Sequence, residues 1–152
     1  MLKIRPAKKS DLDHLKSVID SSRLFPSSKL EEMMKGYFEK TEECIWLTLD
    51  INEPSMVAYV SHEKLTDGTW NLYLIASHPL VQGRGYGKKM IAHIENELKK
   101  RQVRVLVVET SGLPEYETSR DFYENCGFTK EATIRDFYDK DDDKVIFWKD
   151  LT

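Results

Sequence analysis

The most informative part of the chain is the glycine-rich loop Gln82-Gly83-Arg84-Gly85-Tyr86-Gly87-Lys88. A strand-like segment ending at Ser77 precedes this loop, and apolar residues at helical spacing follow it: Met90, Ile91, Ile94 and Leu98. Glycine lets a backbone approach a ligand closely, and the first N–H groups of a helix have no partner within the helix. With the helix dipole and the cations Arg84 and Lys88, the loop predicts an anion site, most often for phosphate.

Two common phosphate-binding loops do not fit these letters. A Walker loop requires glycine at position 82 and serine or threonine at 89, where the chain has Gln82 and Lys89. A dinucleotide fingerprint requires glycine at position 88, where the chain has Lys88. From the loop alone, a plain strand–helix turn without a ligand remains an alternative.

Length and composition restrict the class of protein. The 152 residues predict one domain over 1–152, and an apolar content of 40% is enough for a core. A net charge of −3 argues against nucleic-acid binding by bulk electrostatics. The sequence shows no signal-peptide core and no apolar run of membrane length, which predicts a cytoplasmic protein without membrane contact. Cys44 and Cys126 are predicted to be buried thiols.

Periodicity predicts an α/β (α+β) fold with a mixed, mostly antiparallel sheet. Three helices are expected to open at capping boxes, Ser10 with Asp13, Ser28 with Glu31 and Thr118 with Asp121, and a fourth follows the glycine loop. Strands are expected at 2–6, 45–51, 56–64, 70–77, 103–109, 128–137 and 145–149. The strand–helix–strand unit across the loop predicts that 70–77 and 103–109 run parallel.

Four smaller patterns complete this prediction. The apolar run Val105–Val108 predicts a strand buried on both faces. The methionine and aromatic stripe of the second helix, over 30–38, is read as core. The apolar break at Phe25 is expected to line a ligand groove. The acidic turn 139–143 resembles a calcium loop, but Lys144 stands where glycine is required, so a solvated hairpin tip is expected.

Two separate motifs carry a resemblance to a known family. Gln82, Gly85 and Gly87 match a Gln-x-x-Gly-x-Gly loop, and residues 122–128 match a Phe-Tyr-x-x-x-Gly-Phe signature. In both motifs and in element order the chain resembles the GNAT superfamily of N-acyltransferases over essentially its whole length. The resemblance implies a sheet of about seven strands flanked by about four helices, with a central parallel pair splayed to hold the cofactor.

The resemblance also implies acetyl-CoA as cosubstrate and no metal. The backbone N–H groups of 83–88 would hold the CoA pyrophosphate, and the pantetheine arm would pair with the strand edge at Ile75–Ser77. The Ser77 N–H would polarise the thioester carbonyl. The implied cofactor-binding residues are Ile75, Ala76, Ser77, Gln82, Gly83, Arg84, Gly85, Tyr86, Gly87, Lys88, Ser119 and Tyr123.

The same resemblance makes Tyr123 the acid that protonates the leaving thiolate. On a helix Tyr123 and Phe122 point about 100° apart, so Phe122 is expected to face the core and Tyr123 the cofactor cleft. The alternative is a tyrosine whose hydroxyl bonds a backbone carbonyl. A protonated amine must lose a proton before it attacks. Glu109 is the first candidate base, either catalytic or only a strand-end carboxylate, with His78 and His62 as other candidates.

The chain departs from the family pattern at two positions shortly before Tyr123. Tyr116 stands where asparagine is common and Ser119 where alanine is common. The expected function is direct transfer of acetyl from acetyl-CoA to a primary amine of a small molecule, amino acid or peptide, by a monomer or homodimer. Phe25 is the candidate acceptor-binding residue. The alternative is a catalytically weak acyl-CoA-binding sensor, which the presence of Tyr123 disfavours.

Overall fold

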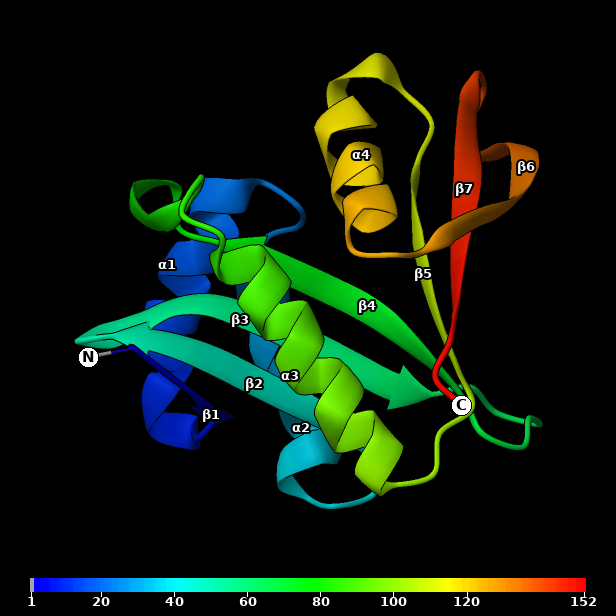
Figure 1. The fold of residues 1–152 in the computed structure, drawn as a ribbon. Helices are drawn as coiled ribbons and strands as arrows, with labels where there is room; N and C mark the ends of the chain where they lie inside the picture. Colours follow the sequence, from blue (N-terminus) through cyan, green and yellow to red (C-terminus); the bar gives the residue numbers. More distant parts are fainter. Residues whose placement is uncertain (1) are drawn as a thin grey trace. The chain divides into compact units, whose positions relative to one another are not determined.

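The structure, a computed structural model, describes residues 2–152 (Figure 1). The strands are β1 (Leu2–Pro6), β2 (Cys44–Ile51), β3 (Glu53–His62), β4 (Thr69–Ser77), β5 (Val105–Ser111), β6 (Thr129–Asp139) and β7 (Asp142–Asp150). The α-helices are α1 (Leu12–Ser22), α2 (Leu30–Phe38), α3 (Tyr86–Lys100) and α4 (Glu117–Asn125). Short 3₁₀ turns lie at η1 (Lys9–Asp11), η2 (Ser27–Lys29), η3 (Pro79–Val81) and η4 (Pro114–Tyr116).

The strands form a seven-stranded sheet in the order β1-β2-β3-β4-β5-β7-β6. The pairs β1–β2, β2–β3, β5–β7 and β6–β7 are antiparallel, whereas β4 and β5 are parallel and are joined by the crossover helix α3. This arrangement confirms the predicted mixed sheet with one central parallel pair. It also places the glycine loop directly after β4, at the start of α3.

Pairing between β4 and β5 is short. It runs from Thr69 opposite Val105 to Leu72 opposite Val108, and no further pair between these strands is present in residues 2–152. At the same point the chain divides into two compact units: unit 1 is Met1–His62 with Tyr73–Ile94, and unit 2 is Glu63–Leu72 with Glu95–Thr152. The second half of β4 therefore belongs to unit 1 and its first half to unit 2.

The core of unit 1 joins α1 and α2 to the strands. Figure 1 shows both helices behind β2 and β3, with α3 in front. Met34 of α2 is fully buried, and Met33, Tyr37 and Phe38 pack against the same cluster, so the stripe of the second helix is core as predicted. The buried members of the cluster are Ala7, Leu15, Val18, Ile19, Leu30, Met34, Cys44, Trp46, Val57, Leu74 and Ala76.

The core of unit 2 forms around β5, β7 and α4. Only Leu106 and Val108 of the apolar run in β5 are buried, whereas Val105 and Val107 are half-buried. The prediction that this strand is buried on both faces was therefore wrong. Consecutive side chains of a strand point to opposite faces, and here one face packs much more tightly than the other.

The helix starts differ from the predicted capping boxes. The residues before α1, α2 and α4 are Asp11, Lys29 and Tyr116, and none caps its helix with a side-chain hydrogen bond. Each of these helices instead follows directly on a 3₁₀ turn. The hydrogen bonds of a 3₁₀ turn satisfy some of the backbone groups at a helix start that a capping side chain would otherwise bond.

Asp11 does not cap α1 but bonds residues that precede the helix. Its carboxylate accepts two bonds from the Arg5 guanidinium, both 2.8 Å long, and one of 2.7 Å from the Lys8 N–H. Arg5 also donates to Asp50 at 2.7 Å, which ties β1, η1 and β2 together. The Asp11 side chain is 8% exposed, and the hydrogen bonds from Arg5 hold the pKa of its carboxyl below the usual value despite burial.

This lowered pKa predicts how stability depends on pH. A carboxyl with a depressed folded-state pKa stabilises the fold above its unfolded pKa, and the contribution is lost as pH falls through the folded value. We expect Asp11→Asn to lower the free energy of unfolding by about 2 kcal/mol at neutral pH, and this deficit to shrink as pH falls below about 4, the usual aspartate value. Urea unfolding across this range measures it. Exposed Asp13→Asn is the control, and a pH-independent deficit would contradict the role of the ion pair.

Candidate active site

The glycine loop has a backbone that only glycine adopts easily. Gly83 and Gly85 have φ values of +76° and +79°, and a Cβ added at either would meet no atom within 4 Å. A side chain at these positions would therefore not clash with neighbouring atoms, and the space next to the backbone is open. α3 begins directly afterwards, at Tyr86.

The backbone N–H groups of residues 83 to 88 have no acceptor among the described residues. The first backbone donor after them is Lys89, which bonds the Gly85 carbonyl at 3.3 Å. The first turn of α3 contains no acidic residue, while Lys99 and Lys100 lie in its last turn. Unpaired donors at the positive end of a helix dipole, beside exposed Arg84 and Lys88, form a site that fits a phosphate group.

Side chains fix the corner between β4 and this loop. Gln82 Nε2 donates to the Ser77 carbonyl at 3.2 Å. His78 donates its N–H to the Ser55 carbonyl at 2.9 Å, and its Nδ1 accepts from the Leu80 N–H at 3.2 Å. His78 is thus engaged as a turn residue, which weakens its case as a base. Gln82 ties the loop to the strand edge at Ser77.

Tyr123 lies in unit 2 and packs against Phe128 and Phe147, with ring centroids 5.9 Å and 5.6 Å away. It is 7% exposed, whereas Phe122 is half-buried. The prediction that Phe122 faces the core was thus inverted: the ring of Tyr123 is the more buried of the two. Helix spacing shows that two neighbouring aromatic residues point in different directions. It does not show which of them makes the larger apolar contact and is therefore buried.

The hydroxyl of Tyr123 forms no hydrogen bond with a described residue, so the alternative of a bonded backbone carbonyl is not observed. Burial raises the pKa of this phenol well above its usual value, since a phenolate would lose its hydration. A phenol that stays protonated and has no internal partner is available as a proton donor. Ser119 lies one turn earlier on α4 and is half-buried.

Glu109 is two residues from the end of β5, which runs on to Ser111. Its carboxylate lies 3.0 Å from Lys144 Nζ and accepts from Asn71 Nδ2 at 3.3 Å. Asn71 also donates to Glu63 at 3.0 Å, and its enclosed Oδ1 has no partner among residues 2–152. Glu109 is therefore the centre of a polar cluster rather than an isolated base.

Sequence reasoning missed Lys144 and Asn71 as neighbours of Glu109. Lys144 follows an acidic turn and Asn71 interrupts an apolar strand, and neither pattern identifies a partner. The contacts arise from strand register, which places Glu109 opposite Ile146 in β7. An asparagine inside an otherwise apolar strand was the one available signal, because a buried amide needs partners.

The remaining candidates fall in unit 1. Phe25 is half-buried and packs against the unit 1 core, between exposed Leu24 and η2. Ile75 and Ser77 are half-buried and Ala76 is buried at the end of β4. His62, the other candidate base, lies with Nδ1 3.8 Å from Glu43. The structure thus groups the loop, the strand edge and Phe25 in unit 1, and Glu109, Ser119 and Tyr123 in unit 2.

Two other kinds of feature are absent from the described residues. In residues 2–152, no three His, Cys, Asp or Glu side chains are grouped so as to hold a metal ion. No helix in this part of the chain combines the length and apolar character needed to cross a membrane.

Comparison with known proteins agrees with both motifs. The profile of the Acetyltransferase (GNAT) family matches residues 15–128, whereas a search of curated proteins gives no match. A GNAT-family protein from Desulfovibrio desulfuricans is 25% identical, with a TM-score of 0.92 over 100% of both chains. The ribosomal-protein-S18-alanine N-acetyltransferase of Escherichia coli is 21% identical, with a TM-score of 0.79 over 100% of this chain and 95% of that one.

A third structure includes the ligand. It is a Salmonella typhimurium protein with its cofactor acetyl-CoA, 17% identical, with a TM-score of 0.79 over 99% of this chain and 94% of that one. The family profile covers most of the chain, including the glycine loop and the Phe-Tyr-x-x-x-Gly-Phe segment. The seven-stranded sheet with its one parallel pair is the fold these relatives share. The chain therefore belongs to the GNAT family of acetyltransferases.

Proposed function

We propose that this chain is a cytoplasmic, single-domain enzyme that transfers an acetyl group from acetyl-CoA to a primary amine. The observation that carries the proposal is the row of N–H groups from 83 to 88 without acceptors, at the start of α3 and beside two glycines with open space next to them. Acetyl-CoA supplies the activated acetyl group, and its pyrophosphate is the anion that such a row accommodates. Arg84 and Lys88 add cationic charge.

The free edge of β4 complements this anchor. Pairing with β5 ends at Leu72, so the backbone of Ile75–Ser77 forms no ladder with β5, and in this proposal an extended ligand pairs there instead. An added strand would take main-chain hydrogen bonds there, as in other cases of β-augmentation. In this proposal the Ser77 N–H donates to the thioester oxygen, where negative charge develops during attack. The hydrogen bond from the Gln82 side chain to the Ser77 carbonyl holds Ser77 in place.

Two side chains of unit 2 move protons in the proposed reaction. The amine nitrogen attacks the thioester carbon, and the carbon–sulfur bond breaks without a covalent enzyme intermediate. Tyr123 gives its proton to the departing sulfur, and Glu109 takes the proton of the amine directly or through water. Lys144 and Asn71 hold the Glu109 carboxylate in position through an ion pair and a hydrogen bond.

The acceptor is proposed only as a class. Relatives with the same fold include the ribosomal-protein-S18-alanine N-acetyltransferase and a spermidine N-acetyltransferase of Vibrio cholerae. Peptide amino termini, amino acids and small polyamines are therefore the amines to screen, with release of the CoA thiol as the readout. Size-exclusion chromatography with light scattering decides between the proposed monomer and homodimer.

Thermal shift with acetyl-CoA separates the proposal from its alternative. A ligand that binds only the folded state raises the melting temperature. Stabilisation together with thiol release for at least one amine supports an enzyme. Stabilisation without thiol release across the screen would support the weakly catalytic sensor, and no stabilisation at millimolar acetyl-CoA would contradict both.

Phe25 gives a test of the acceptor side. The ring is half-buried between Leu24 and η2, so part of it is available to a ligand. We expect Phe25→Ala to raise the acceptor KM about tenfold and to leave the acetyl-CoA KM nearly unchanged, since removing a binding contact affects the ligand that makes it. Leu24→Ala, beside it and 46% exposed, is the control. Equal changes in both KM values would mean that Phe25 is only structural.

A further inference from the structure

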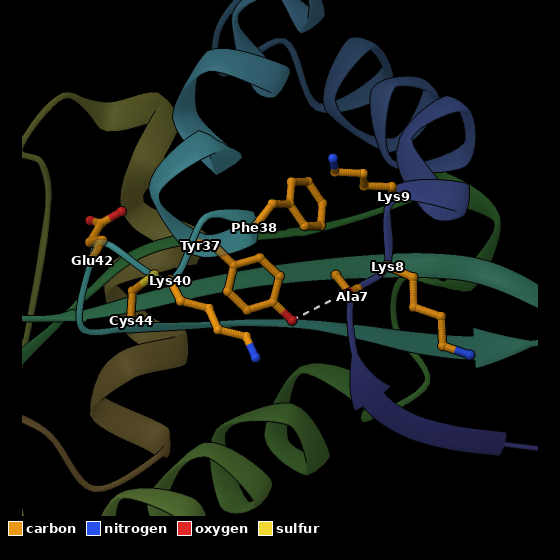
Figure 2. Close-up of a pocket in the computed structure, with 8 residues that line it drawn as sticks. All are labelled: Ala7, Lys8, Lys9, Tyr37, Phe38, Lys40, Glu42 and Cys44. Atoms are coloured by element: carbon orange, nitrogen blue, oxygen red, sulfur yellow. Dashed lines mark hydrogen bonds between the residues drawn. The ribbon is translucent and has the colours of Figure 1, made fainter.

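A pocket lies in unit 1, away from the glycine loop. It has a volume of about 380 Å³ and is lined by Ala7, Lys8, Lys9, Tyr37, Phe38, Lys40, Glu42 and Cys44 (Figure 2). Cys44 pairs with Ser61 near the end of β3, whereas the loop corner contacts Ser55 near its beginning. The pocket and the corner that leads into the loop are thus at opposite ends of β3.

The charge of this pocket is unusual for an acidic protein. Three lysines and one glutamate line it, in a chain of net charge −3. Lys8, Lys9 and Lys40 are exposed and form no ion pair with a carboxylate of residues 2–152. Glu42 is already engaged, because it accepts bonds from the hydroxyls of Tyr59 and Ser61. These ammonium groups are therefore not neutralised by a direct ion pair and can attract a further anion.

Both segments that carry these lysines have a fixed backbone. On one side, Asp11 accepts from the Lys8 N–H and is itself held by Arg5. On the other, Lys40 has a φ of +58°, and the Thr41 and Glu42 N–H groups both bond the Gly36 carbonyl. A Cβ at Gly36 would come within 2.9 Å of Glu42 Cβ, so only glycine permits this close turn.

Aromatic rings form the apolar part of the pocket. Tyr37 and Phe38 lie with ring centroids 5.2 Å apart, and the Tyr37 hydroxyl donates to the Ala7 carbonyl at 2.9 Å. Figure 2 shows the Tyr37 ring between the segments that carry Lys8 and Lys40, with Lys9 beside Phe38. The Lys9 ammonium is 5.6 Å from the Phe38 centroid. Flat apolar surface is thus combined with several cationic groups.

We propose that this pocket binds a small organic anion, a flat apolar body that carries a carboxylate or a phosphate. The rings bury the body, and the ammonium groups of Lys8, Lys9 and Lys40 attract the charged end. The hydroxyl of Tyr37 stays on Ala7 and keeps the ring oriented. The site is independent of the acetyl-CoA loop and does not rest on the proposed reaction.

The test uses the full chain labelled with ¹⁵N and titrated with phenylacetate, phenyl phosphate, inorganic phosphate and neutral phenylacetamide. We expect amide shifts for at least one of the two aromatic anions, concentrated at Lys8–Lys9 and 37–42, with a dissociation constant of about 1 mM. Phenylacetamide should bind at least about tenfold more weakly, because it lacks the charge. Comparison of the two aromatic anions identifies the preferred charged group.

Variants complete the test. Replacing Lys8, Lys9 and Lys40 together by glutamine should weaken binding about tenfold, whereas the same change at exposed Lys3, Lys29 and Lys35, outside the pocket, should not. Saturation with acetyl-CoA should leave the affinity unchanged. Equal weakening by both triple variants, competition by acetyl-CoA, or equal binding of the neutral amide would each overturn the site. If inorganic phosphate bound as tightly as phenyl phosphate, the proposed contribution of the aromatic rings to binding would be wrong.

Discussion

Replacing Gly85 with valine should weaken acetyl-CoA binding at least about 100-fold, equivalent to about 3 kcal/mol. The residue has a φ of +79°, and its missing Cβ faces open space next to N–H groups without acceptors. A valine side chain would fill the space through which the pyrophosphate must approach. It would also disfavour the backbone angle that directs those N–H groups toward it. The acetyl-CoA-induced rise in melting temperature should disappear.

The control for this variant must carry similar backbone strain elsewhere. Gly68, with a φ of +82°, lies before β4 and next to Arg104, far along the chain from the loop. Gly68→Val should lower the melting temperature of the unliganded protein but keep the shift with acetyl-CoA. If Gly85→Val bound acetyl-CoA normally, the loop would be only a strand–helix turn and the proposed function would lose its main support.

Tyr123→Phe should lower kcat by about tenfold to a few hundredfold and leave the acetyl-CoA KM little changed. The substitution removes one oxygen and keeps the ring packed against Phe128 and Phe147. That oxygen has no internal partner, so the free energy of unfolding should change by less than about 0.5 kcal/mol. If Tyr123 is a proton donor, the variant should lose activity without losing stability. A tyrosine with only a structural role would not give this result.

The pH profile gives a second readout for Tyr123. Burial raises the pKa of the phenol, so the side chain remains protonated as pH rises through the usual tyrosine range. Ionisation of this phenol would give the pH–rate profile an alkaline limb that the variant removes. The structure moves any such limb above about pH 10. Wild-type kcat in Tyr123→Phe, with chemistry rate-limiting, would rule the residue out as the acid, and Tyr116→Phe on the same segment is the matched control.

Periodicity was sufficient to predict the order of strands and helices and the parallel β4–β5 pair. Those features depend on local spacing and on the crossover helix, both of which are visible in the chain. It was not sufficient for the helix starts, because 3₁₀ turns replace the capping side chains and Asp11 bonds Arg5 instead.

The candidate site likewise combines features that short motifs predict with features that depend on the whole sheet. The position of the glycine loop before α3 was predicted, because the loop belongs to a motif of short spacing, whereas the roles of the loop and of Tyr123 stay predictions. The pairing of Glu109 with Lys144 and Asn71 was not predicted, because it joins residues from three strands whose register is set by the whole sheet. Which of Phe122 and Tyr123 is buried likewise depends on β7 and on Phe128, not on α4 alone.

The early end of β4–β5 pairing has a consequence for handling the protein. A strand in the middle of a sheet normally has both edges occupied, but Ile75–Ser77 lack a β5 partner on one side. A strand edge without a partner can pair with an extended chain, including another copy of the same protein. Because Ile75–Ser77 is a short segment, few hydrogen bonds can form along it, and this limits self-association. In the proposed binding mode, in which the pantetheine arm pairs with Ile75–Ser77, acetyl-CoA would also protect the protein against aggregation.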